Sequence, residues 1–599
     1  MIALEIDSGL GPRRVDLFSY LDAAREERAH DEEYAWIKAL RQMNVDRVPF
    51  RTRFTLRGDS LWWFAELYLH KQQRILNVLR ALEAFEALVE RERPLAVKYA
   101  GGGYAGPIAH AAAARKIQYA GPRWPTSALS LARMEARAAS LALAARLSRL
   151  RPGRPRASAV RVAAFVHRAF WRPDSADGGA ESYIGPVLRA LEARVPAGDI
   201  RYIGVGPRTN FRARRWWHPL AGTTPAERGG SIVPIERYAA AAALKSSRDI
   251  FDERHRMRES LWTSADIRAH AVIKGCDCWP LVKEELAGIA LLQFPWSARA
   301  MDEAAAALDS TSPDVAVTYA EAGGWGRAIA LECRRRGVPL AGLQHGFIYR
   351  HWLNYRHEPD EMSADPHNAG DAGFPRPAAT LLFDDGAARH LAAAGRFPPE
   401  SLAVTGSARL DDLLATVRSL RPDEIESVKR AVGLVDGRAM VLFAGKEREA
   451  RRFLPALVAA VRSMPDVHLV IKPHPAETAG VYAGAVAGIS NARVTDAAAS
   501  LPALLAAARA VVTVNSTVAI DAMSLGVPSL VIGLPNNLTP FVDAGLMLGA
   551  AATEEIRTSL SKLLYDQEFR GRLVRTPEGR AAERSAEAIL ALAKVKRKT

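Results

Sequence analysis

One stretch of the chain, residues 468–533, restricts the possible fold more than any other. An apolar run at 467–471 ends in Lys-Pro-His-Pro, and the prolines on both sides of His474 exclude a helix or a central strand there. We therefore expect a buried strand that ends in a rigid loop. The spacing beyond this loop predicts a strand at 511–514, a helix at 517–525 and a strand at 529–533. Together these elements predict a βαβ unit of a parallel sheet.

The start of the predicted helix is rich in polar groups. Asn515, Ser516 and Thr517 follow the strand directly, so backbone N–H groups, the helix dipole and two hydroxyls meet at the carboxyl end of a strand. We expect an anionic ligand there. Asp521 lies one helical turn deeper, where it can hold a ribose hydroxyl or a base amine. The alternative is that Ser516 only caps the helix and that Asp521 only faces solvent.

These motifs resemble those of a known family. Lys-Pro-His-Pro, followed about forty residues later by Asn-Ser-Thr-x-x-x-Asp and then by a Gly-x-Pro strand, is similar to the donor half of bacterial GT-B glycosyltransferases of the surface-polysaccharide group. That group includes capsular Kdo and sialic-acid transferases and the CDP-glycerol polymerases of wall teichoic acid. The resemblance implies a nucleotide-activated donor held by His474, Lys472 and the Ser516 helix start. It also implies that Lys446 and Arg448, in a turn after a strand, face the donor pyrophosphate.

Composition restricts the class of protein. The chain has 599 residues, 49% of them hydrophobic and 25% charged, which is typical of globular proteins with two to four domains. No apolar run reaches the roughly 18 residues of a membrane span and no signal sequence is evident, so we expect a cytoplasmic protein. Three cysteines are too few for a disulfide framework. The net charge of +15 favours phosphate-bearing substrates or an anionic membrane surface, because no nucleic-acid fold signature is present.

The order of strands, helices and linkers predicts four segments. These are an α/β unit at 1–124, a basic helix and linker at 125–156, a Rossmann-like acceptor domain at 157–420 and a Rossmann-like donor domain at 421–599. The pattern of strand, glycine turn, helix and strand at 95–122 recurs at 315–342, which suggests that the first unit is also a Rossmann-like half. The basic helix can lie on the inner face of the cytoplasmic membrane, or it can connect two domains.

Charged residues near the first strand of the 157–420 segment are candidates for acceptor chemistry. Asp177 and Glu181 lie at the glycine turn after that strand, where a carboxylate can serve as a general base. Arg208 and Arg212 lie in a basic, aromatic loop after the next strand. This loop can hold an acidic acceptor, or it can remain solvated.

A second candidate base follows a later strand of the same segment. Gln344 and His345 precede a glycine at the end of a strand that begins at Leu340, and a histidine near its usual pKa is the common general base at neutral pH. The Gln-His-Gly triplet is similar to the His-Gly element of the teichoic-acid polymerases, whose histidine is a base candidate. His345 can also be a histidine of the core.

These observations predict an α/β protein of the GT-B class, with two Rossmann-like domains facing a cleft and an extra N-terminal α/β unit. We expect an enzyme that transfers a sugar from a nucleotide-activated donor to a surface-polysaccharide or lipid-linked glycan acceptor. Helix dipole, hydroxyls and histidine stabilise the leaving phosphate, so we expect neither a metal nor a cofactor beyond the nucleotide sugar. Two alternatives stay open: a CDP-alditol phosphotransferase of the teichoic-acid type, and a non-catalytic GT-B scaffold in glycan assembly.

Overall fold

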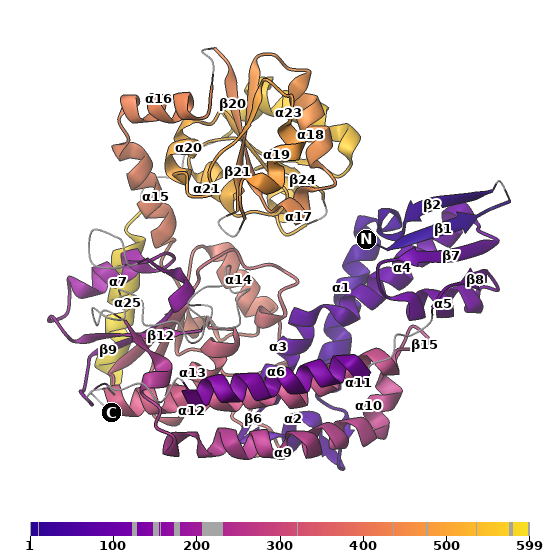
Figure 1. The fold of residues 1–599 in the computed structure, drawn as a ribbon. Coiled ribbons are helices and arrows are strands. Elements are labelled where there is room, and N and C mark those ends of the chain that lie inside the picture. Colours follow the sequence, from indigo (N-terminus) through magenta and orange to yellow (C-terminus); the bar gives the residue numbers. More distant parts are fainter. Residues whose placement is uncertain are drawn as a thin grey trace.

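The computed structural model contains two parallel α/β domains and an N-terminal unit that extends beside them (Figure 1). It describes residues 2–9, 11–122, 128–147, 155, 157–172, 180–206, 232–319, 321–434, 437–474, 477–534, 536–573 and 579–596. Two Rossmann-like domains that face each other and an additional α/β unit are the fold class predicted for a GT-B protein. That prediction is confirmed.

The first domain is built on a seven-stranded sheet in which all neighbouring strands are parallel. Its strands, in spatial order, are β13 (Val233–Pro234), β12 (Ile200–Val205), β9 (Val162–His167), β16 (Val315–Tyr319), β17 (Leu340–Leu343), β18 (Ala379–Leu382) and β19 (Leu402–Val404). The central strands are continuous apolar runs because helices cover both faces of the sheet. Helices α7 (Gly185–Glu192), α13 (Gly324–Arg335), α14 (Asp385–Ala393) and α15 (Ala408–Ser419) belong to this domain.

A helical insertion separates β13 from β16. It comprises α9 (Lys245–Thr263), α10 (Ala265–His270), α11 (Trp279–Gly288), the π-helical segment η7 (Ile289–Gln293) and α12 (Phe294–Thr311). The predicted domain at 157–420 therefore contains more than a Rossmann-like sheet. Helix α6 (Ala128–Leu147), the predicted basic helix, lies along η7 and α11 (Figure 1).

The N-terminal unit has a mixed sheet and not the expected Rossmann-like one. Its strands are β2 (Pro12–Asp16), β1 (Ala3–Asp7), β7 (Ala96–Gly101) and β8 (Gln118–Ala120), and its main helices are α1 (Ala23–Leu40), α3 (Trp62–Gln72), α4 (Arg74–Glu92) and α5 (Ala105–Ala114). The segment β7–α5–β8 does form the predicted parallel unit, as does β16–α13–β17. However, β1 runs antiparallel to both of its neighbours, so the similarity ends with that local unit.

A buried ion-pair network joins the N-terminal unit to the first domain. Lys38 of α1 lies 2.7 Å from Glu66 of α3 and 2.7 Å from Glu361. Arg327 of α13 also binds Glu66, and all four side chains are almost completely buried. Two cations balance two anions, as burial requires. Apolar residues of the unit, the insertion and segment 322–397 form one continuous core around the network.

The second domain has a six-stranded parallel sheet. Its strands, in spatial order, are β22 (Ala492–Val494), β21 (Val467–Pro473), β20 (Ala439–Gly445), β23 (Ala510–Thr513), β24 (Ser529–Ile532) and β25 (Leu548–Ala550). Helices α16 (Pro422–Ala431), α18 (Leu454–Arg462), α19 (Gly480–Val486), α20 (Leu501–Ala507), α21 (Val518–Ser524), α22 (Thr539–Asp543) and α23 (Ile556–Tyr565) surround it.

The predicted βαβ unit is present as β23, α21 and β24, each within one residue of its predicted bounds. The strand before it differs from the prediction, because β21 continues through Pro473 instead of ending at residue 471. Pro473 pairs with Gly445 of β20, whereas β22, on the other side, pairs only with residues 469–471. The missing N–H of the proline therefore interrupts no ladder on that side.

The last helix, α25 (Ala581–Lys596), leaves the second domain and packs against α7 of the first domain (Figure 1). Its residues Ala586, Ile589 and Leu590 belong to the same apolar cluster as strand β9. Residues 421–599 were expected to form one domain, but the apolar face of α25 is buried elsewhere. Among the described residues, no helix is long and apolar enough to cross a membrane.

Candidate functional site

The strand order of the second domain defines a topological switch point. From β20 the chain forms β21 and β22 on one side, and then returns to form β23 on the other side of β20. Open parallel sheets bind ligands at the carboxyl ends of the two strands that flank such a point. At these ends the Thr513 hydroxyl of β23 donates to the Ala444 carbonyl of β20 at 2.6 Å. Lys446 and Asn515 follow the two strands and are therefore placed at the switch point.

Two predicted donor-binding residues lie close together here. His474 follows β21, the strand that neighbours β20. Burial, together with the charge of Lys446, lowers the pKa of His474. Its imidazole is therefore neutral at pH 7 and still offers one N–H donor. Lys446 is about half exposed, with Nζ 3.6 Å from the Glu449 carboxylate. A cationic amine and a neutral imidazole thus stand side by side at the carboxyl edge of this sheet.

The Asn-Ser-Thr turn adds polar groups beside them. The Ser516 N–H donates to the Thr513 hydroxyl at 3.1 Å, and the Ser516 hydroxyl accepts the Val518 N–H at 3.3 Å. The N-cap residue of α21 is Thr517 and not Ser516, and no side chain forms the cap hydrogen bond, so the alternative that Ser516 is only an N-cap is not met in that form. Asn515 differs, because its Oδ1 atom is buried and has no hydrogen-bond partner among the residues that the structure describes.

Three other predicted donor-binding residues either have partners within the protein or lie exposed at the surface. Asp521, expected to hold a ribose or a base, instead accepts from Arg409 of α15, with Nη1 and Oδ2 3.1 Å apart. Lys472 donates from Nζ to the Ala497 carbonyl at 2.8 Å and is nearly buried. Arg448 is exposed on the short helix Glu447–Ala450. Sequence spacing placed these residues near the site but did not reveal their partners.

The first domain has its own switch point, between β9 and β16. His167 ends β9 and Tyr319 ends β16, with ring centroids 5.2 Å apart. His345, two residues after β17, lies on the other side of Tyr319 at 5.4 Å. Tyr183, just before α7, packs edge-on against His345 at 5.6 Å. We call these four residues the ring cluster. Sequence reasoning missed His167, although its place at the end of the first strand of a Rossmann-like sheet was a usable signal.

Three members of the ring cluster, His167, Tyr319 and His345, are uncharged at neutral pH. Burial and, to a smaller extent, the charge of the nearby His167 together lower the pKa of His345 to about 4. Burial also lowers the pKa of His167 to about 4 and raises that of Tyr319 above its usual value. His345 was expected to keep a nearly normal pKa, and this expectation is wrong because the ring is enclosed. A neutral imidazole can still accept a proton from a hydroxyl that becomes acidic as it reacts.

Two predicted acceptor-side residues have internal hydrogen-bond partners. Glu181 accepts the N–H groups of Tyr183 and Ile184, both at 2.6 Å, so it binds the backbone of the turn just before α7. The Gln344 side chain accepts the Phe383 N–H at 2.8 Å and donates to the Gly346 carbonyl at 2.9 Å, which links the ends of β17 and β18. Asp177, Arg208 and Arg212 lie outside the described residues.

The carboxyl edges of the two sheets face each other. Phe347, in the loop after β17, packs on Phe541 of α22 with ring centroids 4.9 Å apart. Tyr349 of the same loop hydrogen-bonds with the Asn537 side chain. Burial and the negative charge of Glu449 raise the pKa of Tyr349. With the Arg409 ion pair, these contacts connect the loop that carries His345 to the strand ends that carry the donor-side residues.

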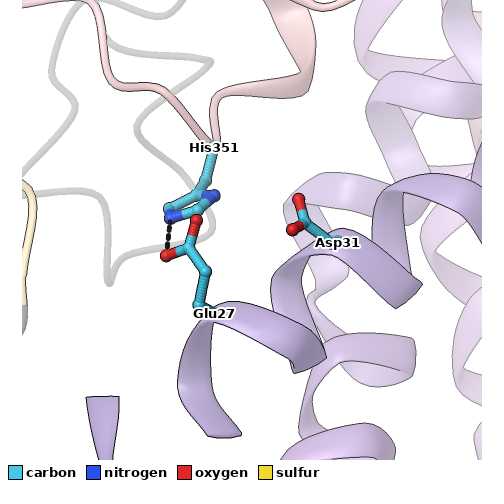
Figure 2. Close-up of side chains that lie close together, drawn as sticks. All are labelled: Glu27, Asp31 and His351. Atoms are coloured by element: carbon cyan, nitrogen blue, oxygen red, sulfur yellow. Dashed lines mark ion pairs between the residues drawn. The ribbon is translucent and has the colours of Figure 1, made fainter. Parts of the chain in front are cut away.

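Glu27, Asp31 and His351 form a group with the spacing of metal ligands at the contact between α1 and the loop after β17 (Figure 2). The carboxylates already have cationic partners. Glu27 lies 2.6 Å from Arg350, and Asp31 lies 3.2 Å from Arg356. His351 is 3.0 Å from Glu27, and burial lowers its pKa to about 3. We interpret the group as an ion-pair cluster that fixes this contact.

One family model matches a part of the chain. The model of a family described as capsule polysaccharide biosynthesis protein matches residues 435–540. The match spans the Lys-Pro-His-Pro loop and the Asn-Ser-Thr turn, so the resemblance to surface-polysaccharide proteins is confirmed for this part of the chain. No curated protein matches the sequence significantly.

Solved structures give only a distant likeness. A UDP-GlcNAc 2-epimerase from Neisseria meningitidis, bound to UDP-GlcNAc, has 13% identity and a TM-score of 0.45 over 73% of this chain and 100% of its own. A putative UDP-N-acetylglucosamine 2-epimerase from Listeria monocytogenes has 17% identity and a TM-score of 0.45 over 74% and 97%. A spinosyn rhamnosyltransferase has 14% identity and a TM-score of 0.38 over 73% and 99%. At these values no functional residue can be transferred to this chain.

Proposed function

We propose that the protein is a glycosyltransferase of surface-polysaccharide assembly, which transfers a sugar from a nucleotide-activated donor to a glycan hydroxyl. One observation carries the proposal: two parallel sheets face each other, and each presents hydrogen-bonding side chains at its own topological switch point. The family match of residues 435–540 supports a role in capsule-type polysaccharides. Such an arrangement allows two ligands to meet between the domains.

On the donor side, the residues at the β20 and β23 ends would bind the nucleotide diphosphate or monophosphate. Lys446 supplies positive charge and His474 supplies an N–H donor toward phosphate oxygens. The free amide oxygen of Asn515 can accept from a ribose hydroxyl or a base amine, which is the role first expected of Asp521. These groups stabilise the charge of the leaving phosphate, and no metal ion enters the proposed step.

On the acceptor side, His345 would act as the general base. Its imidazole takes the proton of the acceptor hydroxyl while the hydroxyl oxygen forms a bond to the anomeric carbon of the donor sugar. The bond between that carbon and the phosphate oxygen breaks, and the electron pair leaves with the nucleotide. Glu181 is a weaker candidate because its carboxylate already accepts two backbone N–H groups of the turn before α7.

A screen of the full chain against CMP-, CDP-, UDP- and GDP-linked donors tests the proposal. A true donor at a hundred times its Kd should stabilise the protein by about 2.7 kcal/mol and raise its Tm. Replacing His474 by Ala should weaken nucleotide binding by about 1.5 to 3 kcal/mol. Replacing His345 by Ala should leave binding nearly unchanged but lower turnover by about 10² to 10⁴. His367→Ala, at an exposed histidine of the first domain, is the control.

Mass-resolved products separate the competing functions. A transferred sugar supports the proposal, whereas a transferred alditol phosphate indicates the phosphotransferase. Nucleotide binding without turnover indicates a non-catalytic scaffold. If no donor shifts the Tm and none is turned over, the proposed function is wrong.

A further inference from the structure

His167 occupies a position in the first domain that the proposed reaction has not yet used. It is the last residue of β9, the strand that flanks the switch point on one side, and Tyr319 ends the strand on the other side. Side chains at these two ends line the crevice in which open parallel sheets bind their ligands. His345 comes from the next strand along, β17. Three neighbouring strands therefore present the order His, Tyr, His along one edge of the sheet.

The surroundings hold the His167 ring in place. The backbone N–H of His167 donates to the Tyr319 hydroxyl at 3.3 Å, and the two rings are 5.2 Å apart. Phe170 lies edge-on at 6.3 Å. On the far side is Gly206, where an added Cβ would lie 3.4 Å from His167 Nδ1. A glycine with φ of 73° at this position leaves space next to that nitrogen.

Within the described part of the chain, no side chain or backbone group hydrogen-bonds to a ring nitrogen of His167 or His345. Both side chains are partly buried, and the resulting desolvation is the main cause of their lowered pKa values. Each neutral ring offers one N–H donor and one nitrogen acceptor. The ring nitrogens of His167 and His345 are not among the fully buried atoms that lack a partner, so they stay accessible to water or to the hydroxyls of a ligand.

We propose that His167 is a second acceptor-side residue, which hydrogen-bonds to a sugar hydroxyl next to the one that His345 deprotonates. The inference rests on the proposed function. The ligand class is a sugar ring with neighbouring hydroxyls, because two imidazoles on either side of the Tyr319 ring can bind two hydroxyls of one ring. Tyr183 and Tyr319 supply aromatic faces for its C–H groups. His167 thus orients the acceptor, and His345 takes the proton.

Binding and turnover, measured separately on the full chain, test this assignment. The binding probe is a panel of methyl glycosides of common hexoses, detected by saturation-transfer NMR without any donor. Wild-type protein should bind at least one glycoside, and His167→Ala should weaken that binding at least tenfold. His167→Asn, which keeps a donor and an acceptor, should restore part of it. His367→Ala is the matched control, and Tm values establish that each variant is folded.

Turnover measurements distinguish this inference from the proposed function. With a donor and a glycoside, His167→Ala should raise the acceptor KM at least tenfold and leave nucleotide affinity unchanged. Equal glycoside affinity in wild type and His167→Ala would overturn the inference, as would a wild-type protein that binds no glycoside of the panel. If no nucleotide is released from any donor, the proposed function fails, and the NMR titration still decides the role of His167.

Discussion

At the scale of single residues, the least expected group is a buried carboxyl near the end of β16. Glu321 is 1% exposed, and its Oε1 accepts from the Tyr355 hydroxyl at 2.9 Å. The other oxygen has no hydrogen-bond partner among the described residues. Burial raises the pKa of Glu321 to about 7. The folded chain therefore keeps this proton to a higher pH than the unfolded chain, in which the carboxyl ionises near its usual value of about 4.3.

This raised pKa predicts a pH-dependent stability. Between pH 4.3 and 7 the unfolded state binds fewer protons, so stability falls as pH rises, by about 3 kcal/mol in total. Glu321→Gln cannot ionise and should lose none of this stability. Relative to wild type, the Tm of the variant should rise by roughly 2 to 4 °C between pH 5 and pH 8, because the unfolding entropy of a chain of this size is large. Glu400→Gln, at an exposed carboxylate, should show no such trend. A constant Tm difference for Glu321→Gln would contradict the raised pKa.

At the scale of elements, helix α15 connects the two domains. Its Arg409 binds Asp521 of α21 in the second domain, and its Asp411 accepts the Gly579 and Ala581 N–H groups at the start of α25. Leu413 of the same helix packs into the core of the second domain. Asp521 is buried and Arg409 is mostly so. Removing one partner therefore leaves a charge that water cannot fully solvate.

We expect Asp521→Asn to destabilise the protein by about 3 kcal/mol, because the largely buried Arg409 guanidinium then has no counter-ion. Replacing both residues, with Arg409→Met and Asp521→Leu, should cost less than the single change. Thermal melts of the variants give the comparison. The control is Arg189→Gln, which removes the exposed contact with Asp412 and should cost less than about 1 kcal/mol. Equal losses for Asp521→Asn and Arg189→Gln would mean that the buried pair contributes no more than an exposed one.

At the scale of the whole molecule, the net charge of +15 and the placement of α6 suggest a membrane contact. One face of α6 is fixed to the body of the protein through Ala138, which is buried. The opposite face exposes Leu129 and Leu143, at 62% and 57%, together with Arg133 and Arg137. The connector role and the membrane role considered for this helix thus use different faces.

We propose weak, salt-sensitive binding of the protein to vesicles that contain anionic lipid. Each basic residue near such a surface contributes about 1 kcal/mol. Arg133→Glu with Arg137→Glu should therefore lower the bound fraction strongly in a sedimentation assay at low salt. The matched pair Arg462→Glu and Arg557→Glu makes the same change in net charge at exposed sites of the second domain. If both pairs reduce binding equally, the contact depends on net charge and not on α6.

The local units of this protein can be predicted from its sequence. Apolar runs, prolines and glycines specify the strand before His474 and the β23–α21–β24 unit, because strand and turn propensities act over a few neighbouring residues. The same local signals placed His345 and His474 at the carboxyl ends of strands. They could not predict the mixed N-terminal sheet or the return of α25 to the first domain, because these depend on which distant apolar faces cover each other.

The partners of the charged and titratable residues, in contrast, depend on the three-dimensional packing of the chain. Asp521 and Lys472 have plausible ligand-binding positions in the sequence, yet an arginine from the other domain and a backbone carbonyl 25 residues away engage them. The lowered pKa of His345 likewise arises from rings contributed by three other segments. Ion pairing and desolvation act through space between residues far apart in the chain, so sequence spacing does not predict them.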